Sequence, residues 1–347
     1  MTFSTASLVF GTFRQQPVLP VIQSHPYQPS FSLEPGWHRI AGPPKRRLAA
    51  SAARLAAGGG IGYVARRQGG RHERPDDATI LGTGDAAMFN AGDLATALWR
   101  ARTEGGVIRR AAADGLASVE MAYGVQREIT SLAGLSRLGW KVGVTSMAAQ
   151  RLLGIETPAT GPLFADHCFD SPAEVAVFSG QDAGVESEFA FRFARDLPPR
   201  GAVYGRAEVL AAVGAVLPAI EVVGCRLEGG FDDLGAVRLI ADMTANTAWV
   251  KGPERKDWRG IDLIGHRVGL QRDGETVAEG VGANALGDPL NVLEWTANHL
   301  SALGDGIKAG EVVSTGTCTG VTPIAPGETL IADFGTLGCV EVRIIAA

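Results

Sequence analysis

The sequence has few aromatic residues and no long apolar run. Phe, Trp and Tyr make up 7% of its 347 residues, whereas glycine alone occupies 46 positions. That balance is typical of a protein with many turns and short strands. No stretch approaches the roughly 20 consecutive apolar residues that a membrane-spanning helix needs, so we expect no membrane partner.

Cysteine and net charge are also scarce. The four cysteines form no C-x-x-C pair and their spacing fits no zinc pattern, which predicts reduced thiols in a cytoplasmic protein. The formal net charge of −5 gives the whole molecule no basic excess to attract nucleic acid or an anionic membrane surface.

The chain changes character near Met88. Residues 1–87 carry ten basic side chains against five acidic ones, are rich in Pro, Gln, Ser and Gly, and show no sustained period of 2 or 3.6. A disordered tail, a targeting peptide and an upstream extension from a start codon set too early all fit this composition. Scattered prolines break any long amphipathic helix there, which favours a disordered or spurious extension.

From residue 88 to 347 the pattern is orderly and predicts one β-rich α+β domain. Apolar residues recur at roughly helical spacing over 91–137. A later helix is marked by Asp288 as its cap, Pro289 in its first turn and Gly304 beyond its end. The predicted β-type runs are 140–144, 175–178, 185–193, 220–223, 267–270, 312–313 and 340–345.

A strand predicted over 185–193 has an aromatic face and an acidic face, because strand side chains alternate. The aromatic face, which we assign to the core, carries Phe189, Phe191 and Phe193. On the other face the carboxylates of Glu186 and Glu188 repel each other unless a cation lies between them. Mg²⁺ or Mn²⁺ suits two such oxygens. The alternative is a solvated face with Arg192 as partner, which the pair alone favours.

A third acid, Glu221, stands in the apolar run 217–223. An ionised carboxylate there is costly to bury unless it is paired or binds a metal. A pair with Arg226 is one explanation. The other is a three-oxygen metal site with Glu186 and Glu188, whose octahedron water and a bidentate ligand would complete.

Two further ionisable residues stand out. Lys141 interrupts the apolar run 140–144, either as a charged residue on an edge strand or as a desolvated, reactive lysine beside a metal site. Asp166 is either a turn residue or a proton carrier, and by itself it favours the turn. His167 beside it is more often structural than catalytic.

Seven short segments in a fixed order resemble a known family. They are residues 122–126, 139–146, 161–166, 186–188, 217–223, 285–291 and 315–317. Together they resemble the fumarylacetoacetate hydrolase superfamily, and within it the branch of 2-keto-4-pentenoate hydratase and 4-oxalocrotonate decarboxylase. Residues 1–87 have no counterpart in that family.

The resemblance implies a mixed β-rich α+β fold with a rolled β-sheet core, like the C-terminal domain of fumarylacetoacetase, preceded by helices. It implies that the three glutamates hold Mg²⁺ or Mn²⁺ and that Lys141 and Asp166 transfer protons near the metal. It also implies that Thr315 and Gly316 contact the substrate, a small 2-oxo acid, and that the protein is a homo-oligomer.

The expected activity is a hydratase that adds water to acids like 2-hydroxypenta-2,4-dienoate in aromatic catabolism. The alternatives are a 2-oxo acid decarboxylase of the 4-oxalocrotonate type, a C–C bond hydrolase of the same superfamily, and a non-catalytic binding or structural relative. Two departures leave the reaction open. The stretch 241–247 lacks the Asp-Asn-Ala-Ser run of hydratases, so Thr244 or Thr247 is the candidate hydroxyl, and 315–321 is closer to the ending of the hydrolases.

Overall fold

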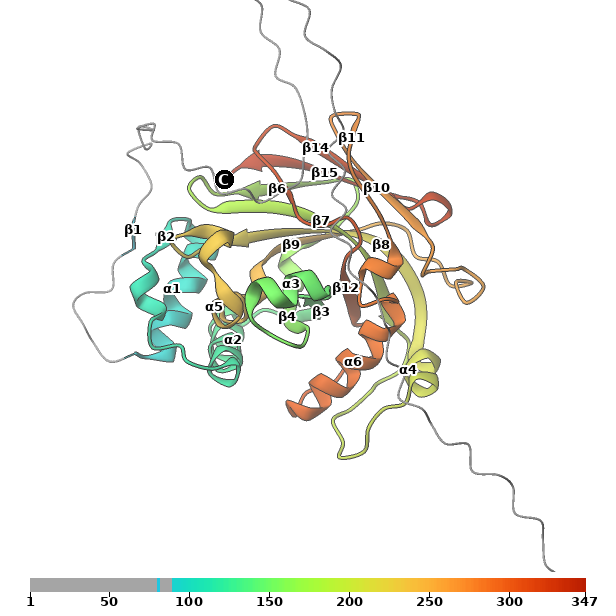
Figure 1. Ribbon diagram of the computed structural model, residues 1–347, viewed down its shortest axis with the longest axis horizontal. Coiled ribbons are helices and arrows are strands. Elements are labelled where there is room, and N and C mark those ends of the chain that lie inside the picture. Colours follow the sequence, from blue (N-terminus) through green and yellow to red (C-terminus); the bar gives the residue numbers. More distant parts are fainter. Residues whose placement is uncertain (1–79, 82–88) are drawn as a thin grey trace, which may run out of the picture. The chain divides into compact units, whose positions relative to one another are not determined.

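The computed structural model describes residues 80–81 and 89–347, which form an α+β fold built on two main β-sheets (Figure 1). The prediction that residues 1–87 form an extension concerns a segment of which only Ile80–Leu81 is described. That dipeptide is a short strand, β1, which pairs in parallel with β2 (Val107–Ile108). The rest of the predicted extension lies outside the described residues.

The helices predicted from the sequence are present, and three short ones are additional. The α-helices are α1 (Ala91–Glu104), α2 (Val119–Ala133), α3 (Met147–Leu153), α4 (Arg206–Ala212), α5 (Gly235–Ala241) and α6 (Pro289–Ala302). The side chains of Asn90 and Ser118 accept backbone hydrogen bonds at the starts of α1 and α2. Asp288 caps α6 in the same way, and Gly304 follows its end with φ 78°, as the sequence predicts.

The larger sheet contains the strands that carry the predicted site. In spatial order they are β4 (Ala159–Phe164), β3 (Arg137–Gly143), β12 (Val312–Thr317), β7 (Asp182–Phe193), β8 (Val213–Cys225), β9 (Asn246–Lys251) and β5 (Cys168–Asp170), with β13 (Thr322–Pro323) beside β7. The smaller sheet has the order β11 (Glu275–Val281), β10 (Arg267–Arg272), β14 (Thr329–Asp333), β15 (Cys339–Ala346) and β6 (Ala173–Val177).

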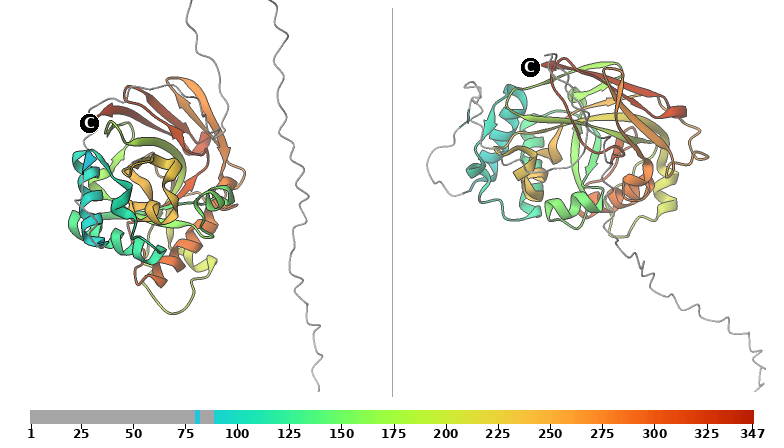
Figure 2. Two further views of the ribbon diagram at one scale, coloured as in Figure 1. Left: turned by 60° about the vertical axis from the view of Figure 1, so that its left-hand side comes forward. Right: turned by 45° about the horizontal axis from the view of Figure 1, so that its top comes forward.

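The larger sheet is rolled. Its two end strands, β4 and β5, are joined by a single 3₁₀ turn over Ala165–His167, so the sheet curls until its ends approach each other. The left view of Figure 2 shows this curl, with the smaller sheet lying against its outer side. The rolled β-sheet core expected from the resemblance is therefore confirmed.

The two faces of the rolled sheet have different chemistry. On the outer face, Phe189, Phe191 and Phe193 are buried in the main core between the sheets, where the ring of Phe189 lies 5.2 Å from that of Phe334, centroid to centroid. The prediction of an aromatic core face is confirmed. The inner face carries a smaller apolar cluster made of Leu163, Ala190, Leu217, Ala219, Trp249 and Val312.

This inner cluster fills the roll on one side of the predicted acidic residues. On β7 it follows Glu188 at Ala190, and on β8 it precedes Glu221 at Leu217 and Ala219. Trp249, the largest fully buried side chain in the described ranges, pairs in register with Glu221. The inner face thus divides into an apolar part and an acidic part.

Helix α6 contacts α2 through a partly buried polar pair. His299 Nε2 lies 3.0 Å from the hydroxyl of Tyr123, which also accepts a hydrogen bond of 3.1 Å from the amide of Thr160. Trp295 stacks on the imidazole with ring centroids 4.4 Å apart. Burial in this contact lowers the pKa of His299 to about 4.

This lowered pKa predicts a loss of stability in mild acid. The unfolded chain binds the proton near the usual pKa of about 6.5, so stability is full above that pH and falls as the pH drops toward 4. Between pH 7 and pH 5, the free energy of unfolding of the wild type should fall by about 1 to 2 kcal/mol more than that of His299→Gln. Urea unfolding at both pH values measures this difference, and parallel losses in the two proteins would contradict it.

Candidate metal centre

Three glutamates meet on the inner face of the rolled sheet. Glu186 and Glu188 lie two residues apart on β7, and Glu221 on β8 pairs in register with Glu186. One carboxylate oxygen from each side chain lies within 4.8 Å of the others, and all three side chains are buried. In the part of the chain that the structure describes, this is the group of side chains close enough together to hold a metal ion.

Glu221 has two nitrogen donors at one oxygen. Lys141 on β3 places its Nζ 3.2 Å from Glu221 Oε1 and donates a 2.9 Å hydrogen bond to the carbonyl of Thr244. Asn246, at the start of β9, donates its Nδ2 to the same Oε1 at 2.9 Å. Glu221 is therefore tied at Oε1, which leaves Oε2 without a protein partner.

Glu188 repeats this arrangement with a hydroxyl. Ser314 on β12 donates a hydrogen bond to Glu188 Oε2, and Trp249 Nε1 donates to the Ser314 hydroxyl at 3.0 Å. Glu188 Oε1 is buried without a hydrogen-bond partner. Two buried, partnerless carboxylate oxygens beside a third carboxylate are the donor set that Mg²⁺ and Mn²⁺ prefer, so these residues fit the ion expected from the sequence.

Burial and mutual repulsion disfavour the ionised forms of the three carboxylates. Burial, followed by the repulsion among the carboxylates, raises the pKa of Glu188 well above its usual range, and burial raises the pKa of Glu186 to about 7. Burial alone would lower the pKa of Lys141, but the three carboxylates, Glu221 first, raise it. Three carboxylates and one ammonium carry a net charge of −2 when all are ionised, which a divalent cation would balance.

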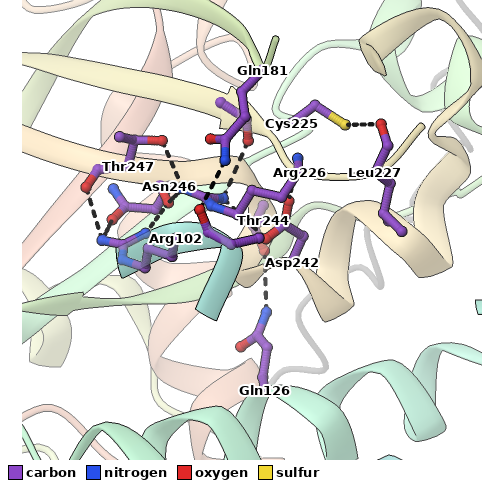
Figure 3. A network of polar contacts seen from close by, with 12 residues as sticks. Arg102, Gln126, Gln181, Cys225, Arg226, Leu227, Asp242, Thr244, Asn246 and Thr247 are labelled. Atoms are coloured by element: carbon purple, nitrogen blue, oxygen red, sulfur yellow. Dashed lines mark hydrogen bonds and ion pairs between the residues drawn. The ribbon is translucent and has the colours of Figure 1, made fainter. Parts of the chain in front are cut away.

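A left-handed turn brings two of these contacts into place. Met243, Thr244 and Ala245 have φ values of 51°, 53° and 62°, a conformation that costs non-glycine residues roughly 1–2 kcal/mol each. Gln126 on α2 donates 2.9 Å and 2.6 Å hydrogen bonds to the carbonyls of Thr160 and Ile240. Its Nε2 also lies 3.3 Å from the hydroxyl of Thr244 in the turn (Figure 3). The turn presents the Thr244 carbonyl to Lys141 and is followed directly by Asn246.

Gly161 allows the turn to approach β4. A Cβ atom at this position would lie 2.4 Å from the carbonyl oxygen of Met243, closer than atoms can approach. The register also places Gly161 beside Lys141. A side chain here would therefore displace the turn on which the Lys141 contact depends.

The hydroxyls of Thr244 and Thr247 do not contact the carboxylates. Thr244 Oγ1 donates to the Thr160 carbonyl at 2.8 Å, and Thr247 Oγ1 accepts from Arg226 at 2.7 Å. Asn246, between them in the sequence, is the residue that reaches Glu221. Sequence reasoning missed it because only the left-handed turn reveals which of these side chains points inward.

Two alternative pairings considered from the sequence are wrong. Arg226 pairs with Asp242 at 2.9 Å and not with Glu221. Arg192 pairs with Glu254 at 2.6 Å, away from the glutamate pair.

The edge-strand interpretation of Lys141 is also wrong. Strand β3 lies between β4 and β12, so it is not at the edge of the sheet. Lys141 is 2% exposed, which fits a desolvated lysine and not a solvated surface one.

Asp166 is a turn residue. It is exposed in the 3₁₀ turn between β4 and β5. The last residue of β4, Phe164, lies three residues beyond Gly161, the partner of Lys141, which is roughly 10 Å along a strand. The role of proton carrier near the metal, which the resemblance implies for Asp166, stays a prediction.

Thr315 and Gly316 lie beside the centre on β12. The Thr315 hydroxyl is buried and donates to the carbonyl of Phe189 at 2.9 Å. Gly316 has φ 86°, and a Cβ there would lie 2.2 Å from the hydroxyl of Thr145. Gly316 thus lets β12 pack against the segment that follows β3, while the Thr315 hydroxyl is occupied by the backbone.

The rolled sheet with its inward-facing glutamates is the arrangement of a metal-binding protein. Comparison with family models shows the family to which the chain belongs. The model of the Fumarylacetoacetate (FAA) hydrolase C-terminal family matches residues 155–345. The chain belongs to the fumarylacetoacetate hydrolase family, which confirms the resemblance recognised from the seven segments.

Relatives place the chain near two kinds of enzyme within this family. It is 33% identical to a 2-keto-4-pentenoate hydratase of Paraburkholderia xenovorans over 229 residues, which are 65% of this chain and 84% of that protein. It is 32% identical to a 4-oxalocrotonate decarboxylase of a Pseudomonas species over 227 residues, 65% and 84% of the two chains. The structure of 4-oxalocrotonate decarboxylase from Pseudomonas putida G7, complexed with magnesium and adipate, superposes with a TM-score of 0.67 at 28% identity, covering 74% of this chain and 97% of that one.

Because the carboxylates of the cluster repel one another, we expect Glu188 to lower the stability of the protein while it contributes to metal binding. We expect Glu188→Gln to leave the metal-free protein at least as stable as the wild type, because one buried charge is removed. Mn²⁺ at about 100 times its Kd should stabilise the wild type by roughly 2.7 kcal/mol and the variant by much less.

Thermal unfolding after EDTA treatment, with and without Mn²⁺, measures both effects. Glu254→Gln is the matched control, because Glu254 pairs with Arg192 and lies outside the cluster. A Glu188→Gln protein with the full Mn²⁺ effect would show that this carboxylate does not bind the ion.

Proposed function

We propose that the chain is a divalent-metal-dependent hydratase that adds water to a small 2-oxo acid of the 2-hydroxypenta-2,4-dienoate type in the catabolism of aromatic compounds. The observation that carries the proposal is the buried glutamate cluster with Lys141 3.2 Å from Glu221. Relatives named 2-keto-4-pentenoate hydratase, at 31–33% identity, support the choice of reaction.

Glu186, Glu188 and Glu221 would hold Mg²⁺ or Mn²⁺. The buried oxygens without partners on Glu188 and Glu221 support this assignment. When bound, the ion supplies positive charge where negative charge develops on the keto oxygen of the substrate. Solved structures of 4-oxalocrotonate decarboxylase that resemble this chain are complexed with magnesium and adipate and with calcium and acetate, which supports a divalent ion here.

Lys141 would donate the proton to the dienol carbon. The carboxylates raise its pKa, which keeps the side chain protonated and so supplied with the proton to be donated. The hydrogen bond to the Thr244 carbonyl and the contact with Glu221 hold its Nζ in one position. A cation bound to the glutamates would counter their effect on Lys141 and bring its pKa closer to neutral pH.

The remaining roles rest on the resemblance. Asp166 would be a second proton carrier, and Thr315 and Gly316 would contact the substrate. Asp166 is exposed, so its role requires the bound substrate or water to reach the turn between β4 and β5. The backbone of Gly316, which has no side chain and lies against Thr145, is better suited to a substrate contact than the occupied Thr315 hydroxyl.

Decarboxylation of a 4-oxalocrotonate-like acid is the second candidate. The observation that favours it is the similarity to the solved 4-oxalocrotonate decarboxylase, which extends over 97% of that chain. The same charge stabilisation would serve loss of CO₂.

We further propose that the protein is a cytoplasmic homo-oligomer. Among the residues that the structure describes, no helix is both long and apolar enough to cross a membrane.

The two candidate reactions can be separated with the full chain. We expect loss of the dienol absorbance of 2-hydroxypenta-2,4-dienoate only when Mg²⁺ or Mn²⁺ is present, with formation of a 4-hydroxy-2-oxo acid. CO₂ release from 4-oxalocrotonate without hydration of the dienol would replace the hydratase by the decarboxylase. No metal-dependent turnover of either acid would overturn the proposal.

The role of Lys141 can be tested in the same assay. Lys141→Met should lower kcat by about 10²–10⁴-fold, because a positioned acid is lost, while Mn²⁺ still binds. Lys256→Met, at an exposed lysine, is the control. A Lys141→Met enzyme with near-normal kcat would remove the lysine from the mechanism.

A further inference from the structure

An arginine from the first helix contacts the residue that orients Glu221. Arg102 on α1 is 6% exposed and donates through Nη1 to the Asn246 carbonyl, through Nη2 to Asn246 Oδ1 at 3.2 Å, and to the Thr247 carbonyl at 2.8 Å. Figure 3 shows the guanidinium directed at these atoms from α1. Two residues that are 144 positions apart in the sequence thus share a buried hydrogen-bond network.

The guanidinium decides which way the Asn246 amide points. A guanidinium only donates hydrogen bonds, so it accepts only the oxygen end of the amide as its partner. With Oδ1 facing Arg102, Nδ2 faces Glu221 Oε1, to which it donates at 2.9 Å. A rotated amide would place its NH₂ group against the Arg102 donors and its oxygen against the Glu221 carboxylate, so both hydrogen bonds would be lost.

The position of Arg102 is costly if it serves packing alone. The other buried arginine of this network, Arg226, pairs directly with Asp242 at 2.9 Å. Arg102 contacts only neutral oxygens, and its Nε is buried without a hydrogen-bond partner. A buried cation with neutral hydrogen-bond partners is expensive. Burial lowers the pKa of Arg102 to about 9, and the nearby carboxylates of Asp242 and Glu221 offset only part of this cost.

We propose that Arg102 is a positioning residue for the metal centre. It acts through Asn246 to hold Glu221 Oε1, so that Glu221 Oε2 stays free for the ion. It touches neither the ion nor the substrate. The inference rests on the proposed function, because it assigns Arg102 to the support of that same metal site.

The test is a double-mutant cycle on Mn²⁺ affinity, measured by calorimetry on the EDTA-treated full chain without substrate. Arg102→Met and Asn246→Ala should each raise the Kd for Mn²⁺ by about 10–100-fold, as loss of a ligand-orienting contact does. Because Arg102 acts through Asn246, the two effects should not multiply. The Kd of the double variant should exceed the higher of the two single-variant Kd values by no more than about 3-fold.

Arg100→Met is the matched control. Arg100 lies two positions earlier on α1, is exposed and pairs with Glu104 at 3.2 Å, so its loss should leave the Kd unchanged. Thermal unfolding of each variant measures its stability separately. A structural role for Arg102 would lower stability and leave the Mn²⁺ affinity of the folded protein at the wild-type value, which would overturn the proposal.

Other outcomes are equally decisive. If the fold-increases in Kd from the two substitutions multiply in the double variant, Arg102 does not act through Asn246. If Arg102→Met does not fold, Arg102→Lys replaces it in the cycle, since a lysine keeps the charge but cannot donate to all three oxygens with the same geometry. A wild-type protein that binds no Mn²⁺ would instead refute the metal site, and the positioning role with it.

Discussion

Repulsion among three buried carboxylates is the constraint around which the rest of the site is arranged. One carboxylate oxygen each of Glu186, Glu188 and Glu221 lies within 4.8 Å of the others, and all three side chains are buried. Each fixed contact on the cluster relieves part of that cost at one oxygen and leaves another oxygen open. An apolar inner face would make a more stable fold, so the cluster is best understood as stability given up for metal binding.

The scaffold supports this cost by dividing the two faces of one strand. Along β7 the outer side chains enter the main core, so the strand is anchored by aromatic burial independently of the acids on its inner side. The neighbouring strands then contribute one polar group each, from β3, β8, β9 and β12. Because these groups come from central strands of a sheet and not from loops, their positions are set by hydrogen-bonded register.

Alternation and capping made much of this fold predictable from the sequence. The period of 2 over 185–193 assigned the phenylalanines and the glutamates to their faces, and Asp288 with Gly304 marked α6. The seven-residue helices and strands β1, β2, β4, β5, β9, β11, β13 and β14 were not predicted. Strand β4, for example, contains Gly161 and Pro162, which are disfavoured in strands. Asn246 and Arg102 could not be predicted, since their contacts depend on a left-handed turn and on pairing over 144 positions. The proton-carrier role of Asp166 came from family resemblance, and its exposed turn shows why local pattern alone indicated otherwise.

The apolar cluster on the inner face limits the directions from which small molecules can reach the glutamates. Leu163, Leu217 and Trp249 pack together on one side of the glutamates, so a small molecule cannot reach the acidic centre from that side. Substrate and product would then have to approach and leave from the same direction. A product that is slow to leave would block the next substrate, so the turnover rate would depend on product release as much as on the bond-making step.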